Sequence, residues 1–396
     1  MASQETLRDD ASSRSSFLYD PKIRSILFQI VVFVVLVLAI GWIVNNTVDN
    51  LRRANISSGY GFMDSRAGFD IAVALIPFSS DSTFGRALVV GFLNTIMVAA
   101  VGILTATIVG FLIGVGRLSK NWLISRICTV YVEVFRNIPP LLVIFFWYLG
   151  VLSVLPLPRD SIELPFYSYL NSRGFFFPRA IWGEGAWLIG LALVVAIALS
   201  WFVARRARAR QMATGQTFPV LLTSIALLVG LPLVAYVVMG FPLTFDYPVL
   251  GAFNLVGGWT VKPEFLALYL ALSFYTASFI AEIVRAGILG VSHGQSEASY
   301  ALGLRAGQTL RLVVVPQAMR IVIPPLTSQY LNLTKNSSLA VAIGYPDLVA
   351  IGGTILNQTG QSIEVVAIWM VVYLGLSLTT SVFMNWFNSR MALVER

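Results

Sequence analysis

The dominant pattern along the chain is a series of long apolar runs separated by shorter polar segments. Each run supplies the ~20 residues that a helix needs to cross a bilayer. The pattern therefore predicts an all-α integral membrane protein with about eight transmembrane helices. We place these helices at Ile26–Val44, Ala87–Val115, Ile127–Leu155, Ala186–Ala204, Phe218–Gly240, Phe265–Leu289, Ile321–Gly344 and Val365–Asn388.

Composition agrees with this prediction and excludes several classes of protein. Of the 396 residues, 57% are hydrophobic and only 12% are charged, whereas soluble domains carry about 25% charged residues. The single cysteine, Cys128, and the single histidine, His293, exclude disulfides, a zinc site and most histidine-based catalysis.

The basic residues set the expected topology. Residues 1–25 are polar and Ser-rich and are expected to form a cytoplasmic tail. The first apolar run lacks a cleavage site after it, so we expect an uncleaved helix at 26–44 and a periplasmic segment at 45–86. With both termini cytoplasmic, Lys and Arg favour the inside by about two to one, as the positive-inside rule requires. The net charge of +8 is accounted for in this way and does not indicate nucleic acid.

A polar segment, Gln295–Pro316, interrupts the apolar pattern between the sixth and seventh predicted spans. Ser292 followed by Gln295 fits a capping box, so a helix is expected to start here. Small residues around Ala298 allow close approach of another protein, Glu297 offers a charge, and Gly303 supplies a turn. We interpret the segment as a docking surface; the alternative is an ordinary basic loop.

Charged residues inside the spans cost about 2.5–3.5 kcal/mol each and need partners or a water-lined path. Glu133 and Arg136 precede Pro139 and Pro140, which are expected to break the third helix where it lines a cavity. Two interpretations stay open: each Glu-x-x-Arg pair neutralises itself on one helix face, or deep cations line a path for a carboxylate. The candidate pathway residues are Glu133, Arg136, Asn137, Glu282, Asn332, Lys335, Ser337 and Ser338. Of these, Arg136 and Lys335 are expected to lie deeper than Glu282 and Arg285.

Two exposed segments, 156–185 and 241–264, are rich in aromatic residues and proline. Aromatic residues in such places usually form an interfacial belt, and this is the preferred interpretation. The alternative is a docking face for an extracytoplasmic partner.

The polar segment resembles the EAA loop of ABC importer permeases. Its positions here are Glu297, Ala298, Ser299 in place of the second alanine, Gly303 and Pro316, and Gln295 begins the segment. The resemblance implies that these residues dock a partner ATPase.

Three further motifs resemble the polar amino acid permeases. They run from Tyr131 to Leu142, from Glu282 to Gly287 and from Lys335 to Leu339. The resemblance implies an ABC type-1 (MetI-like) permease domain at 87–390, interrupted at about 156–264 by two extra helices. This insertion is similar to that of the larger permeases of general L-amino acid importers.

The resemblance implies a function and a set of partners. The function is that of a permease subunit of an ATP-driven importer of L-amino acids, of broad or polar and acidic specificity, in the bacterial inner membrane. The partners are an ABC ATPase dimer that carries ATP and Mg²⁺, a second related permease subunit and a periplasmic amino acid-binding protein. This chain has no Gly-x4-Gly-Lys-Ser/Thr loop, so no bound cofactor and no enzymatic activity are expected of it.

Two other classes of protein remain as alternatives. An ion-coupled secondary amino acid transporter would also use buried charges and broken helices, but the chain has no visible internal repeat. An integral membrane enzyme is a weaker alternative, because no catalytic cluster lies at a suitable depth.

Overall fold

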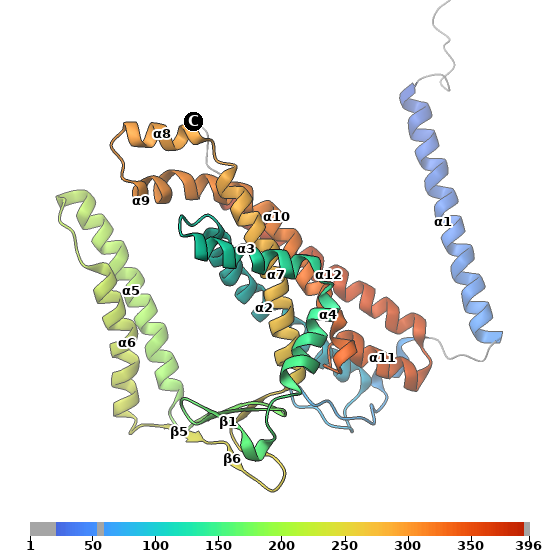
Figure 1. Ribbon diagram of the computed structural model, residues 1–396. Coiled ribbons are helices and arrows are strands. Elements are labelled where there is room, and N and C mark those ends of the chain that lie inside the picture. Colours follow the sequence, from blue (N-terminus) through green and yellow to red (C-terminus); the bar gives the residue numbers. More distant parts are fainter. Residues whose placement is uncertain (1–20, 54–58, 392–396) are drawn as a thin grey trace, which may run out of the picture.

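The computed structural model describes residues 21–53 and 59–391, and most of them are helical (Figure 1). The α-helices are α1 (Pro21–Arg53), α2 (Phe84–Arg117), α3 (Trp122–Asn137), α4 (Pro140–Phe145), α5 (Trp187–Thr214), α6 (Val220–Val238), α7 (Pro263–Leu289), α8 (His293–Ala301), α9 (Ala306–Thr309), α10 (Val315–Asn336), α11 (Leu348–Thr359) and α12 (Ser362–Met391). Short 3₁₀ and π segments are η2 (Tyr60–Asp64), η3 (Phe146–Leu152), η4 (Pro158–Asp160), η5 (Leu310–Val314) and η6 (Ser337–Ile343).

In the part of the chain that the structure describes, seven helices are long and apolar enough to cross a membrane, and a bent pair makes an eighth if it counts as one span. This agrees with the predicted number. The bent pair consists of α3 on one side of the break and α4 with η3 on the other. The helix axis is bent by 111° at this break. Ile138, before Pro139, is extended rather than helical, as expected of a residue that precedes proline. The predicted break in the third span is confirmed.

Several predicted boundaries were wrong. The helix predicted at 26–44 runs from Pro21 to Arg53, so it extends through residues 45–53 of the segment predicted to be periplasmic. Helix α5 continues ten residues past the predicted end at Ala204 and ends at Thr214. This extension contains Arg205, Arg206, Arg208 and Arg210. The short helix α11 was not predicted, because its 12 residues do not reach the length of a span.

Helices α2, α7 and α10 form the centre of the bundle, and the bent pair and α12 pack around them (Figure 1). Fully buried side chains such as Leu268, Leu272 and Ile280 of α7 contribute to one continuous hydrophobic core. Glycines of α2 allow the close approach of α7. A Cβ atom at Gly110 would lie 2.6 Å from the Cβ of Ile280, and one at Gly114 would lie 2.7 Å from the carbonyl oxygen of Ala281.

A second core joins the segment that begins at Gly59 to α2, α11 and α12. Phe62, Ala67, Leu348 and Ile355 are buried in it. The backbone N–H of Gly59 donates to Glu364 of α12 at 2.6 Å. From Gly59 onward, the segment predicted to be periplasmic at 45–86 is therefore packed against the bundle.

The two aromatic segments contain strands, which the all-α prediction missed. The strands are β1 (Ile162–Leu164), β2 (Ser168–Asn171), β3 (Gly174–Phe177), β4 (Arg179–Trp182), β5 (Leu243–Asp246), β6 (Val249–Leu250), β7 (Leu255–Val256) and β8 (Trp259–Val261). They form an antiparallel sheet in the order β1-β2-β3-β8 and two separate pairs, β4-β5 and β6-β7. With two to four residues each, they are too short to give a clear alternation of polar and apolar positions.

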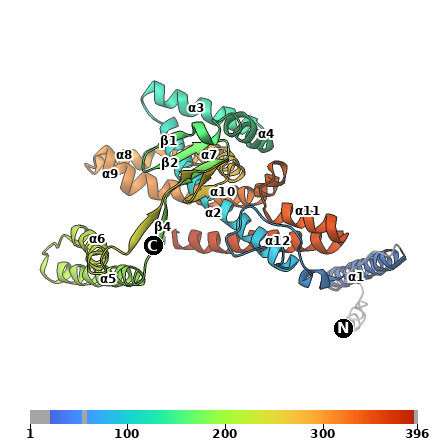
Figure 2. The same cartoon turned by 90° about the horizontal axis from the view of Figure 1, so that it is seen from below.

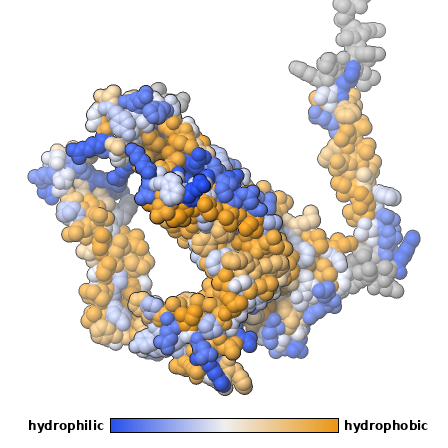
Figure 3. All heavy atoms as spheres, in the orientation of Figure 1, coloured by the Kyte–Doolittle hydropathy of each residue, from blue (hydrophilic) through white to orange (hydrophobic). Residues whose placement is uncertain are grey.

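The strands lie at one end of the bundle, the sheet end, and α8 and α9 lie at the opposite end, the α8 end (Figure 1). Two parts stand apart from the bundle in both views, namely α1 and the α5–α6 hairpin (Figures 1 and 2). In the space-filling view, an open gap with apolar walls separates the hairpin from the bundle (Figure 3). Among the described residues, α6 has no buried side chain and α5 has only Ala196 and Ala207.

Candidate functional site

The polar segment folds as a helical hairpin at the α8 end. Helix α8 begins after Ser292, as predicted, but the expected capping box is not formed, because the Ser292 side chain makes no capping hydrogen bond. The Gln295 side chain instead accepts a hydrogen bond from Nε2 of Gln317 at 3.1 Å. This bond ties the first turn of α8 to α10.

The turn predicted at Gly303 is confirmed. Helix α8 ends at Ala301, and Gly303 has a φ of +79°, which an L-residue rarely adopts. The chain then enters α9 and η5 and continues into α10, whose first turn contains Pro316. Proline fits this position because the first N–H groups of a helix have no partner within it. The segment is therefore a defined hairpin that leads directly into a central helix.

One face of α8 is exposed in the part of the chain that the structure describes. On it, Glu297 is exposed and contacts His293 at 3.1 Å. Ser299 is buried, so a small side chain is needed at this position for the hairpin to close. Its hydroxyl donates to the Gln295 carbonyl at 2.7 Å. Tyr300 and Leu302, which the sequence analysis did not single out, are 53% and 82% exposed. An apolar pair beside a carboxylate on a projecting helix is suited to bind another protein.

The charged residues of α3 and α7 meet in an interhelical ion cluster near the start of the α7–α8 connection. Glu282 contacts Arg117 at the end of α2, Arg136 of α3 at 3.6 Å and Arg285 of its own helix at 3.3 Å. Glu133 lies 3.8 Å from Arg117. The Arg117 side chain is only 9% exposed. The cluster therefore joins the ends of α2, α3 and α7.

This arrangement corrects two expectations. Pairing within one helix occurs for Glu282 and Arg285, but no ion pair between Glu133 and Arg136 is formed among the described residues. Arg136 is also not deeper than Glu282, because the two side chains touch. Arg117, 165 residues from Glu282 in sequence, is not among the predicted pathway residues and proves to be central to the cluster.

The cluster has three guanidinium groups and two carboxylates, so one positive charge is in excess. Arg136 is 38% exposed and lies over the ring of Phe279 at 5.6 Å. A half-exposed guanidinium beside an aromatic ring remains able to accept an anionic partner.

The remaining pathway residues form no single site with this cluster. Asn137 donates to the Glu133 carbonyl at 2.7 Å, and the hydroxyls of Ser337 and Ser338 donate to the carbonyls of Thr334 and Lys335. Asn332 and Lys335 are exposed on α10. Within residues 21–53 and 59–391, no ion pair involves Lys335. In the same ranges, no group of three His, Cys, Asp or Glu residues could hold a metal ion.

Comparison with known proteins identifies the family. Residues 210–393 match the family described as "Binding-protein-dependent transport system inner membrane component". The chain is 67% identical to the general L-amino acid transport system permease protein AapQ of Rhizobium johnstonii, over 96% of this chain and 95% of that protein. It is 42% identical to the glutamate/glutamine/aspartate/asparagine transport system permease protein BztB of Rhodobacter capsulatus, over 96% of this chain and 97% of that protein.

A solved structure gives a more distant match. A crystal structure of an amino acid ABC transporter with histidines covers 78% of this chain and 95% of its own, at 19% identity and a TM-score of 0.47. The curated relatives agree with the expected permease and not with the alternative of an ion-coupled secondary transporter. The chain, a multi-pass inner membrane protein, therefore belongs to the permease family of amino-acid ABC transporters.

Proposed function

We propose that this chain is the permease subunit of an ATP-driven importer that moves L-amino acids inward by alternating access. The observation that carries the proposal is the α8 hairpin, which exposes Glu297, Tyr300 and Leu302 and runs directly into α10. Since α10 packs against α7 and α12, a displacement of the hairpin is transmitted to the centre of the bundle.

The α8 end faces the cytoplasm in this proposal, as do both termini. A partner ATPase dimer, which carries ATP and Mg²⁺, binds the hairpin there and moves it when the dimer closes. A second related permease subunit completes the pathway, and a periplasmic binding protein delivers the amino acid at the sheet end. The names of the matched family and relatives support a binding-protein-dependent system.

The proposed substrate pathway is argued from charge. Arg136 in the ion cluster and Lys335 on α10 are exposed cations within apolar helices, and each offers a partner to a substrate carboxylate. Glu282 contacts Arg136 at 3.6 Å, while Glu133 and Asn137 lie on the same helix as Arg136 and are joined by a hydrogen bond from the Asn137 side chain to the Glu133 carbonyl. Opening of the ion cluster would separate the ends of α2, α3 and α7 on the inward side.

The coupling role is tested with Glu297→Lys in the reconstituted complex. We expect the variant to insert normally and to lose amino acid uptake, with ATP hydrolysis no longer stimulated by loaded binding protein, because a cation replaces the carboxylate on the docking face. Glu163→Lys, an exposed acidic position at the sheet end, is the matched control and should transport normally. Wild-type uptake by Glu297→Lys would overturn the coupling role.

A further inference from the structure

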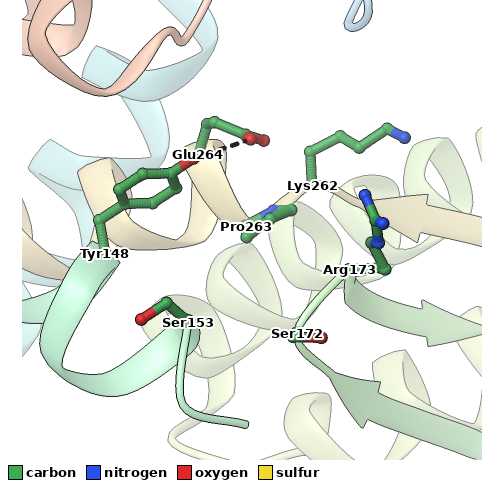
Figure 4. A pocket seen from close by; sticks show the side chains of 7 residues that line it. All are labelled: Tyr148, Ser153, Ser172, Arg173, Lys262, Pro263 and Glu264. Carbon is green, nitrogen blue, oxygen red and sulfur yellow. Dashed lines mark hydrogen bonds between the residues drawn. The ribbon is translucent and has the colours of Figure 1, made fainter. Parts of the chain in front are cut away.

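A hollow of about 220 Å³ lies at the sheet end, where the inserted region meets the permease core (Figure 4). Three elements line it: Tyr148 comes from η3, Ser172 and Arg173 from the turn between β2 and β3, and Lys262 and Glu264 from the start of α7. No residue of the α8 hairpin or of the ion cluster lines it. It is therefore a separate feature of the molecule.

Strand pairing brings the two cations of the hollow together. Phe175 of β3 lies opposite Val261 of β8 in an antiparallel pair, so the turn before β3 meets the residues that follow β8. The turn itself is well defined, because the fully buried Asn171 accepts a hydrogen bond from the Arg173 N–H at 2.8 Å. The strand pairing and the turn therefore place Arg173 and Lys262 on the same side of the hollow, and this placement does not depend on contact between their side chains.

The charges of the hollow are separated. The Arg173 and Lys262 side chains extend to one side of Pro263, and the Glu264 carboxylate lies on the other (Figure 4). The Tyr148 hydroxyl donates to Glu264 at 3.3 Å. In the described part of the chain, neither cation forms an ion pair. Two neighbouring cations that form no ion pair with a carboxylate favour the binding of an anion.

We propose that this hollow binds the zwitterionic head of an amino acid, with the α-carboxylate on Arg173 and Lys262 and the α-ammonium on Glu264. The inference rests on the proposed function, because the amino acid arrives at the sheet end. The volume is below the roughly 300–1,000 Å³ of pockets that enclose drug-sized ligands, so the hollow takes the head and leaves the side chain outside. Recognition through groups that all amino acids share would admit different side chains and gives the insertion a role in substrate entry.

The test uses thiol labelling at the hollow in the purified transporter complex without binding protein. Ser172→Cys is introduced together with Cys128→Ala, which removes the single native cysteine. The rate of reaction with a small thiosulfonate reagent is then measured at increasing concentrations of glycine or L-glutamine. We expect both amino acids to slow the labelling, whereas glycinamide, which lacks the carboxylate, and N-acetylglycine, which lacks the ammonium, leave the rate unchanged.

Charge variants and a reference cysteine complete the test. Arg173→Gln and Lys262→Gln should each raise the protecting concentration of glycine about tenfold or more, because charge-assisted hydrogen bonds are lost. Arg159→Gln, an exposed cation outside the hollow, should leave it unchanged. A cysteine at the exposed Ser79 should label at the same rate with and without glycine.

Three outcomes would overturn the inference. Labelling that is insensitive to glycine means that the hollow is empty of amino acid. Equal protection by glycinamide means that no zwitterion is recognised. Protection by binding protein without amino acid, where glycine gives none, means that the hollow is a protein contact. ATP-driven uptake of L-glutamine is measured in parallel: uptake without protection refutes only this inference, and absent uptake by the wild-type complex refutes the proposed function.

Discussion

Two pairs of apolar helices in this protein differ sharply in how they pack. Helices α2 and α7 contact each other closely and bury residues along their length, whereas α5 and α6, within the described part of the chain, pack mainly against one another and leave their outer faces exposed (Figures 1 and 3). Both pairs contain glycines. A Cβ atom at Gly110 or Gly114 of α2 would collide with α7, while one at Gly190 of α5 or Gly230 of α6 would have no atom within 4 Å.

The difference shows that apolar character alone does not decide helix packing in a membrane. Lipid tails are as apolar as leucine, so helices associate through close backbone approach and polar contacts. The α2–α7 pair has both, since Thr105 and Tyr269 share a hydrogen bond at 2.9 Å and Arg117 contacts Glu282. The sequence from 185 to 245, which spans the hairpin, contains no acidic residue at all. The hairpin surface is therefore suited to lipid or to another subunit.

The largest expected effect comes from filling the α2–α7 contact. Gly114→Leu should cost about 3 kcal/mol or more, because the added side chain overlaps the Ala281 carbonyl and Val284 and the two helices must separate. We expect loss of the monodisperse purified protein and a lower melting temperature. Gly230→Leu on α6 is the matched control and should purify as the wild type does; equal damage by both substitutions would show that the hairpin is also tightly packed.

A second prediction concerns a buried carboxylate in the packed region. Asp347, between the last candidate spans, is fully buried and caps α11 through the Ala350 N–H at 2.8 Å. Burial raises the pKa of Asp347 from 3.8 to about 6. Asp347 therefore holds its proton more tightly in the folded state than in the unfolded state. The contribution of this protonation to the free energy of unfolding is complete below about pH 4 and is lost as the pH rises through 6.

The shift in the Asp347 pKa corresponds to roughly 3 kcal/mol at most. Melting temperatures measured between pH 5 and 8 should fall with rising pH in the wild type and fall less in Asp347→Asn, which keeps a capping side chain. Asp160→Asn, at an exposed position, should retain the wild-type slope. A wild-type slope in Asp347→Asn would contradict the prediction.

A smaller effect is expected at the ion cluster. Glu282→Gln leaves Arg117, Arg136 and Arg285 with Glu133 as the remaining carboxylate of the ion cluster among the described residues. The loss should be about 2 kcal/mol, because the Glu282 side chain is 28% exposed and water screens part of the repulsion. Thermal unfolding measures it, and adding Arg117→Gln should restore part of the loss.

Arg208→Gln is the corresponding change in the α5–α6 hairpin. Arg208 is exposed and has no carboxylate nearby in sequence, so we expect little change in stability. A stability loss as large as that of Glu282→Gln would mean that the hairpin arginines have partners of their own.

Local features were predictable where one stretch of sequence carries the cause. The turn at Gly303 and the break before Pro139 follow from the conformations that glycine and proline allow. The strands were not predictable, because they are very short and because β3, whose Phe175 pairs with Leu170 nearby, also pairs through Phe175 with Val261, far along the chain. The capping box at Ser292 failed for a similar reason, since Gln317 of α10 binds the Gln295 side chain.

The sequence by itself determined the membrane-spanning helices, the projecting loop between α7 and α10 and the family, because apolar length and short motifs are local properties. Only the tertiary structure decided which charges meet. The contacts of Glu282 with Arg117 and the neighbouring positions of Arg173 and Lys262 depend on helix and strand pairing. The tertiary structure also decided the different packing of α2 and α6, whose apolar sequences look alike. Neighbouring atoms surround a glycine only once the chain has folded.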